Sequence, residues 1–297
     1  AVRGEYGTGK TFFGRWLQER ARARGFAATE VQINETETPL HRLETVYRRL
    51  VEHLGTADTA SGAFRGVIDG WFYALEQDVL ADASVDASDA EGLLLRTNAL
   101  MEARLGAISK TAPAFSAVLR TYRRALAAGD GMLADGLISW LAGQPNVAAS
   151  IKRAAGIKGD LDHFGATNFL VGLLTILRDS GFSGLVMVLD EVETLQRMRT
   201  DTREKGLNAL RQWIDEIDAG RYPGLYLVIT GTPAFYDGPQ GVQRLAPLAQ
   251  RLHVDFGTDR RFDNPRAVQI RLAAFDHTSL LAVGRRVRDI YADGRPN

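Results

Sequence analysis

Eight consecutive residues near the start of the chain have the types and spacing of a phosphate-binding loop. Residues 4–11 read GEYGTGKT and fit the pattern G-x-x-x-x-G-K-[ST]. Glycines let the backbone curl so that successive amide N–H groups point at one anion, and the helix that follows adds its positive N-terminal dipole. The predicted nucleotide-binding set is Gly4, Glu5, Tyr6, Gly7, Thr8, Gly9, Lys10, Thr11 and Phe12.

Two residues of this loop have predicted individual roles. Lys10 is placed to reach the β- and γ-phosphates of a nucleoside triphosphate, and the Thr11 hydroxyl can ligate Mg²⁺. A glycine-rich turn without a ligand is the alternative, but a periodic helix follows the loop at once, which favours the binding loop. The sequence therefore predicts a site for a nucleotide with Mg²⁺.

Two adjacent acids follow a continuous apolar run far downstream. Residues 185–189 are all apolar, as in a strand covered on both faces, and Asp190 and Glu191 come next. Ligands of open α/β sheets bind at the carboxyl ends of the strands. We expect Asp190 to hold Mg²⁺, directly or through water, and Glu191 to polarise the attacking water. A strand that simply ends in solvated acids is the alternative, and we interpret Glu193 as a surface acid.

A second apolar run ends in hydroxyl side chains. Residues 225–229 lead into Thr230, and Thr232 follows two positions later. A polar side chain at such a strand end could sit beside the γ-phosphate and the attacking water. Ordinary threonines at a strand-ending turn are the alternative, and the sequence does not separate Thr230 from Thr232.

Alternating helices and strands must position these residues. Apolar periodicity predicts helices over residues 11–24, 39–54, 164–179, 207–217, 245–252 and 278–291, and strands over 27–34, 184–189, 224–230 and 253–256. The strand before the loop is expected to be truncated, since only three residues precede Gly4. This alternation predicts an α/β fold with a parallel sheet flanked by helices. Residues 57–160 instead favour short amphipathic helices, which we interpret as an insertion into the sheet.

Composition excludes several classes of site. The 297 residues include 36 basic and 36 acidic ones, so a zero net charge gives no global attraction to DNA or membranes. The absence of cysteine excludes disulfides and thiolate metal sites, and the five histidines show no metal-ligand spacing. No apolar run approaches the roughly 20 residues that a membrane span requires.

The order of these motifs resembles the AAA+ ATPases of the additional-strand class. In that family a strand lies between the loop strand and the acidic strand, which suits two acids so far from Lys10. The resemblance implies ATP hydrolysis with Glu191 as the catalytic acid and a polar switch residue at the end of the second strand. Asn34 matches that position, and a cap of the strand end is the alternative for it. It also implies an arginine finger from a neighbouring subunit, which Arg251 matches best, with Arg244 as the alternative.

A narrower resemblance is to the BrxD family of ATP-binding proteins from bacterial BREX phage-defence systems. Residues 4–13, 37–40, 229–236 and 261–266 carry it. It implies a cytoplasmic ATPase that forms a homo-oligomer and acts with other defence-system proteins on double-stranded DNA. The arginines of residues 260–271 are candidates for DNA contact, with ordinary solvated charge as the alternative.

Together these resemblances predict the domain organisation. An ATPase core would comprise residues 1–56 and 161–275, the helical insertion residues 57–160, and the start of a truncated C-terminal helical lid residues 276–297. A nucleotide-gated scaffold with little turnover is the alternative function. A GTPase is disfavoured because no Asn-Lys-x-Asp motif occurs. A small-molecule kinase is disfavoured because Glu191 follows Asp190 and no substrate pocket is evident.

Overall fold

A five-stranded parallel sheet forms one part of the molecule in the computed structural model, which describes residues 1–82, 88–257, 259 and 263–293. The strands are β1 (Val2–Arg3), β2 (Ala27–Gln32), β3 (Leu185–Asp190), β4 (Leu225–Gly231) and β5 (Ile270–Arg271). They lie in the order β2-β3-β4-β1-β5, and every pairing is parallel. The predicted α/β fold with a parallel sheet is therefore confirmed.

Strand β4 lies between β1 and β3, as the resemblance to the additional-strand class implies. The register pairs Gln32 with Asp190 and Arg3 with Gly231. Because all strands are parallel, their carboxyl ends meet at one edge of the sheet. This edge brings together the chain segments that carry Lys10, Thr11, Asp190 and Thr230.

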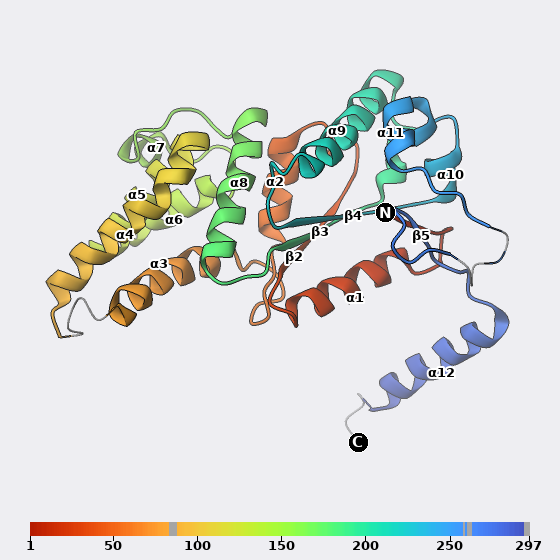
Figure 1. Cartoon of the computed structure of the whole chain (residues 1–297), viewed down its shortest axis with the longest axis horizontal. Helices are drawn as coiled ribbons and strands as arrows, with labels where there is room; N and C mark the ends of the chain where they lie inside the picture. The colour runs from red at the N-terminus through yellow and green to blue at the C-terminus, as the bar shows by residue number, and fades with distance from the viewer. Residues whose placement is uncertain (83–87, 258, 260–262, 294–297) are drawn as a thin grey trace.

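Helices cover both faces of the sheet, and further helices lie beside it (Figure 1). They are α1 (Lys10–Arg22), α2 (Leu43–Glu52), α3 (Phe64–Ala81), α4 (Ala90–Thr111), α5 (Pro113–Ala127), α6 (Gly131–Leu141), α7 (Ala149–Ala154), α8 (His163–Asp179), α9 (Thr200–Asp218), α10 (Pro233–Asp237), α11 (Ala246–Arg251) and α12 (His277–Asp293). Two 3₁₀ helices, η1 (Val192–Arg197) and η2 (Val242–Arg244), follow β3 and α10. Figure 1 shows α1 on one face of the sheet, and α2 and α9 on the other.

The alternation of side chains in β3 explains its continuous apolar sequence. Val186 and Val188 pack in the smaller apolar cluster on the α1 side, whereas Leu185, Met187 and Leu189 join the main core on the opposite side. All six residues of β3 are buried. A central strand buried on both faces therefore delivers Asp190 to the edge of the sheet.

The regular elements in the described part of residues 57–160 are the helices α3–α7. Their apolar side chains, such as Leu105, Tyr122 and Leu141, belong to the same buried cluster as Met187 of the sheet. Figure 1 places these helices beside the sheet, with α8 between them and α2. The segment is thus helical and packs onto the core through one continuous apolar cluster. The division of the chain into core, insertion and lid remains our proposal.

One predicted strand is wrong. Residues 253–256 are not a strand, and the position beside β1 is occupied by β5 instead. The ring of Phe256 lies under the guanidinium groups of Arg3 and Arg271, 5.1 and 4.5 Å from its centroid. Packing against these two arginines, rather than strand pairing, therefore accounts for the apolar residue in this segment.

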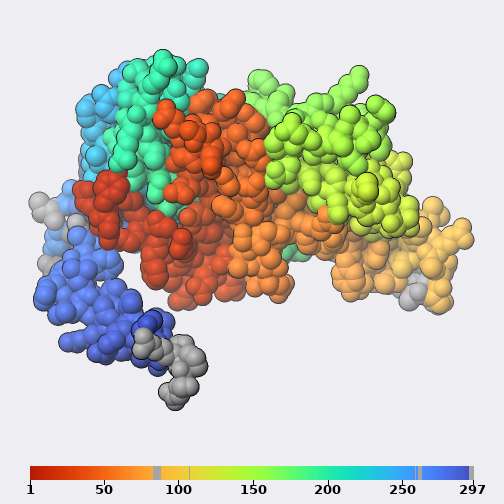
Figure 2. All heavy atoms as spheres, turned by 180° about the vertical axis from the view of Figure 1, so that it is seen from behind, coloured from red at the N-terminus to blue at the C-terminus, as the bar shows by residue number. Residues whose placement is uncertain are grey.

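Helix boundaries differ from the predicted ones where local turns intervene. Helix α2 begins at Leu43 because residues 39–42 form turns, and α9 begins at Thr200, seven residues before its predicted start. The predicted C-terminal amphipathic helix is α12, which has no buried residue. Figure 2 shows α12 standing away from the rest of the molecule.

Candidate functional site

The loop at residues 4–9 connects β1 to α1 and turns sharply through two glycines. The Gly4 amide donates to the Gly231 carbonyl (3.1 Å), which fixes the start of the loop to the end of β4. Gly7 and Gly9 have φ angles of +80° and +89°, a region that residues with a Cβ rarely adopt. Helix α1 begins directly after Gly9, as the Phe13 amide donates to the Gly9 carbonyl (2.8 Å). Gly7 and Gly9 therefore supply the left-handed backbone on which the curl of the loop depends.

The Lys10 side chain folds back under this loop. Its ammonium Nζ donates to the carbonyls of Gly4 (3.0 Å) and Glu5 (3.3 Å), and it lies 5.1 Å from the centroid of the Tyr6 ring. Lys10 is buried, so its charge is held by the protein rather than by water. The positive charge predicted for this loop is thus held directly beneath the loop backbone.

Asp190 is the point at which three segments of the chain meet. The Thr11 hydroxyl donates to Oδ2 of Asp190 (2.9 Å), while the Thr230 hydroxyl and the Glu191 amide (3.0 Å) donate to Oδ1. Asp190 is 3% exposed and Thr230 is fully buried. Three donors compensate the burial of this carboxylate. The geometry brings Thr11, Asp190 and Thr230 together.

Glu191 has an unusual backbone conformation. Its φ of +58° is one of two positive values among the described non-glycine residues, the other being Asn146. Such a conformation costs on the order of 1–3 kcal/mol and is found preferentially at functional sites. It ends β3 abruptly and starts η1, whose first turn is held by the Thr194 hydroxyl donating to the Glu191 carbonyl (2.8 Å). The side chain of Glu191 is partly exposed beside the buried Asp190.

The expectation that Glu193 is a surface acid is wrong. Glu193 is 5% exposed, and its Oε1 lies 3.6 Å from Nζ of Lys10. Burial raises the pKa of the Glu193 carboxyl, and the nearby Asp190 and Glu191 carboxylates add to this rise, whereas a hydrogen bond from its own backbone amide and the Lys10 ammonium oppose it. The turn after β3 brings Glu193 back beneath the loop. The one signal in the sequence was an acid three positions beyond Asp190, next to the apolar Val192.

Two predicted site residues have side chains engaged in local turns. Oδ1 of Asn34 accepts from the amides of Thr36 (3.1 Å), Glu37 (2.7 Å) and Thr38 (3.1 Å), which caps the loop after β2. Thr232 is the N-cap of α10 and accepts from the Phe235 amide at 3.3 Å. Both therefore have the local capping role that the sequence left open as the alternative.

The two candidate finger arginines lie on the outer helices. Arg251, at the end of α11, pairs with Asp215, and Arg244 of η2 donates to Glu204 at 2.7 Å. Both acids belong to α9, so both arginines are held by the same helix of their own chain. The structure does not bring either arginine to the loop.

The remaining candidates flank the loop or lie outside the described residues. Phe12 is 75% exposed, and the exposed Tyr6 accepts from the Arg197 guanidinium through its hydroxyl (3.1 Å). Of the arginines suggested for DNA contact, those at 260 and 261 lie outside the described residues, as does part of the string 261–266. Arg271 pairs with Asp263 through Nε at 2.7 Å.

The oxygen atoms of Thr11 and Asp190 fit an Mg²⁺ ion bound with a nucleotide. Mg²⁺ usually takes one or two protein oxygens and completes its shell with water and phosphate oxygens. A hydroxyl and a carboxylate that already touch provide such a pair. No group of three or more potential metal-ligating His, Cys, Asp or Glu side chains occurs in the described part of the chain, so any Mg²⁺ there would depend on the phosphates.

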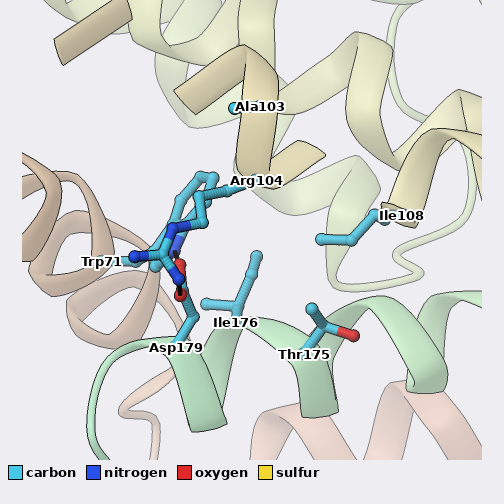
Figure 3. A pocket seen from close by; sticks show the side chains of 7 residues that line it. All are labelled: Trp71, Ala103, Arg104, Ile108, Thr175, Ile176 and Asp179. Atoms are coloured by element: carbon cyan, nitrogen blue, oxygen red, sulfur yellow. Dashed lines mark hydrogen bonds and ion pairs between the residues drawn. The ribbon is translucent and has the colours of Figure 1, made fainter. Parts of the chain in front are cut away.

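A separate pocket lies among the helices at the other end of the molecule. It has a volume of about 270 Å³ between α3, α4 and α8. Figure 3 shows Trp71 and Arg104 converging on Asp179, and both donate to its carboxylate, at 2.6 and 2.5 Å. Because these polar groups satisfy one another, we interpret the cluster as a structural link between α8 and the insertion.

Comparison with known proteins places the chain in one family. The family model described as BREX system ATP-binding protein BrxC/D matches residues 1–297. No curated protein and no solved structure matches the chain significantly. Within the described residues, none of the helices has both the length and the apolar character that crossing a membrane demands.

Proposed function

The chain belongs to the family of BREX system ATP-binding proteins BrxC/D, and from this premise we propose that it hydrolyses ATP with Mg²⁺ at the edge of its sheet. Family membership establishes ATP binding and a link to phage defence. The contact between Thr11 and Asp190 carries the proposal of hydrolysis, since it joins the phosphate-binding loop to the acidic strand. Turnover requires both parts at one phosphate group.

Each residue of the site then has a defined task. Lys10 contacts the β- and γ-phosphates, while Thr11 and Asp190 supply oxygens to Mg²⁺, which offsets charge on the phosphates. Glu191 accepts a proton from the attacking water, and its partly exposed position beside Asp190 supports this role. Thr230, which donates to Asp190, is better placed than Thr232 to orient the carboxylate.

An assembly of several subunits completes the proposal. An arginine finger supplied by a neighbouring subunit stabilises the charge that develops on the transferred phosphoryl group. Arg251 lies on the outside of the chain, which supports contact with another subunit. We propose that such a homo-oligomer acts with other defence-system proteins on double-stranded DNA in the bacterial cytoplasm.

Glu191→Gln tests hydrolysis directly. The substitution keeps the shape of the side chain but removes the base, so we expect unchanged ATP binding and a loss of steady-state hydrolysis of at least about a hundredfold. Glu91→Gln, an exposed substitution in α4, is the matched control and should hydrolyse ATP as the wild type does. Tight ATP binding without turnover in the wild type would instead support the nucleotide-gated scaffold.

Lys10→Ala tests ATP binding itself, because it removes the charge that contacts the phosphates. We expect it to abolish ATP binding in the same assay. Assembly is tested by measuring the molecular mass with ADP, and then with a non-hydrolysable ATP analogue, each with and without duplex DNA. A mass that is the same in all four conditions would contradict nucleotide- or DNA-driven assembly.

A further inference from the structure

The ammonium group of Lys10 lies among oxygen atoms of its own chain. An ammonium has three N–H donors, and two of those of Lys10 are used by the Gly4 and Glu5 carbonyls. One donor remains for an anion. The Glu193 carboxylate, 3.6 Å away, is the anion that pairs with it, and both side chains are more than nine-tenths buried.

We propose that Glu193 competes with the nucleotide phosphates for Lys10 and thereby lowers the affinity of the site for ATP. The inference rests on the proposed function, since it assumes that Lys10 contacts the phosphates. A phosphate oxygen would take the donor that now faces Glu193 while the loop carbonyls keep theirs. Binding of ATP therefore requires the exchange of one anionic partner for another.

The carboxylate of Glu193 is poorly stabilised apart from Lys10. Its Oε2 is buried and has no hydrogen-bond partner, and the groups that offset its charge are its own backbone amide and the Lys10 ammonium, which is its cationic partner. Asp190 and Glu191 add further negative charge nearby. When Lys10 turns to a phosphate, Glu193 loses its counter-ion and gains another anion in a low-dielectric environment. Both effects oppose binding, and the repulsion is greater for ATP than for ADP because ATP carries more charge.

Glu193→Gln tests the proposal because it removes the charge and keeps the shape. We expect the Kd for ATP to fall about tenfold and the Kd for ADP by a smaller factor. Glu193→Asp keeps the charge but shortens the side chain, so its Kd for ATP should lie between those of the wild type and Glu193→Gln. Nucleotide affinity is measured by calorimetry on the full chain, with thermal unfolding as a check that each variant is folded.

Glu30→Gln is the matched control for the loss of a charge. Glu30 lies on β2 and accepts from Gln18 at 2.9 Å, and it has no ion pair with Lys10. We expect its Kd for ATP to stay within about twofold of the wild type. Equal changes in both Glu→Gln variants would mean that net charge, rather than competition for Lys10, sets the affinity, and would overturn the proposal.

Two other outcomes have different meanings. A wild type that binds ATP while Glu193→Gln binds it equally or more weakly would refute competition, because Glu193 would then support Lys10 in the bound state. A wild type without affinity for ATP would contradict the proposed function itself. If Glu193→Gln does not fold, Glu193→Asp alone decides: an affinity no higher than that of the wild type refutes the proposal.

Discussion

The hydroxyl of Thr11 lies 2.9 Å from Oδ2 of Asp190, although 179 residues separate them in sequence. This contact fixes the first turn of α1 against the end of β3. On its other oxygen, Asp190 accepts from Thr230 at the end of β4. One buried carboxylate at the end of β3 therefore connects α1 to the end of β4, and its orientation depends on two hydroxyl groups and the Glu191 amide.

Thr230→Val should reduce both stability and ATP hydrolysis. The substitution removes the hydroxyl that donates to Oδ1 of the buried Asp190 and leaves the Glu191 amide as the remaining donor there. The loss of such a donor to a buried carboxylate lowers the unfolding free energy by about 1–3 kcal/mol. Denaturant unfolding and steady-state hydrolysis check the two effects, and Thr230→Ser should restore most of each.

Thr232→Val provides the comparison. Loss of its N-cap contact to Phe235 should cost about 1 kcal/mol of stability, and hydrolysis should fall less than in Thr230→Val. If the order of the two effects on hydrolysis is reversed, Thr232 rather than Thr230 is the threonine on which hydrolysis depends.

Much of the fold could be predicted because the signals were local. The loop pattern at residues 4–11 and the apolar run before Asp190 each reflect a strict backbone or burial requirement, and both led to the observed sheet. The prediction of a strand at residues 253–256 failed because a short segment of alternating polarity does not show whether it has a neighbouring strand to pair with. Residues Ile270 and Arg271 pair with the edge of β1 instead. The packing of Phe256 on Arg3 is a tertiary contact, which a local sequence pattern does not show.

The site was predictable only in outline. The motifs predict that Lys10, Thr11 and Asp190 lie close together, because each of them has a fixed position relative to a strand end. Burial of Glu193 depends on the turn that starts at Glu191, whose positive φ could not be read from the sequence. The choice between a switch residue and a loop cap at Asn34, likewise, depends on the turn that follows β2.

Asp179→Ala should destabilise the contact between α8 and the insertion. The carboxylate accepts from the indole of Trp71 and the guanidinium of Arg104, and its side chain is largely buried. Loss of the Asp179 carboxylate leaves the Trp71 N–H without this acceptor, which lowers the unfolding free energy by about 1–3 kcal/mol. Urea unfolding measures the change, and ATP affinity should be unaffected because the cluster lies away from the loop.

Asp78→Ala is the matched control for this cluster. Asp78 pairs with the same Arg104 at 3.4 Å, but both side chains are about half exposed. Such surface pairs contribute at most about 1 kcal/mol. Equal losses in Asp179→Ala and Asp78→Ala would mean that the buried indole contact has no special role.

Arg251→Ala should lose hydrolysis but recover it in mixtures with Lys10→Ala subunits. In a mixed assembly, an Arg251→Ala subunit retains an intact loop and receives Arg251 from its Lys10→Ala neighbour. Hydrolysis by the mixture, measured against each variant alone, checks this. Arg244→Ala serves as the comparison, because Arg244 also pairs with α9. Recovery with Arg244→Ala and none with Arg251→Ala would identify Arg244 as the finger.

Glu30 should make the protein less stable as the pH rises. Burial raises the pKa of its carboxyl above the ordinary 4.5, while the hydrogen bond from Gln18 and the charges of Arg15 and His53 oppose the shift. The folded chain therefore retains this proton at pH values where the unfolded chain has lost it, so the contribution is full below 4.5 and is lost as the pH rises through the raised pKa. Glu30→Gln cannot ionise. The unfolding free energy of the wild type minus that of Glu30→Gln should thus decrease from about pH 4 to pH 7. Urea unfolding at several pH values measures this difference, and an increase with pH would show that ionised Glu30 is stabilised by its neighbours instead.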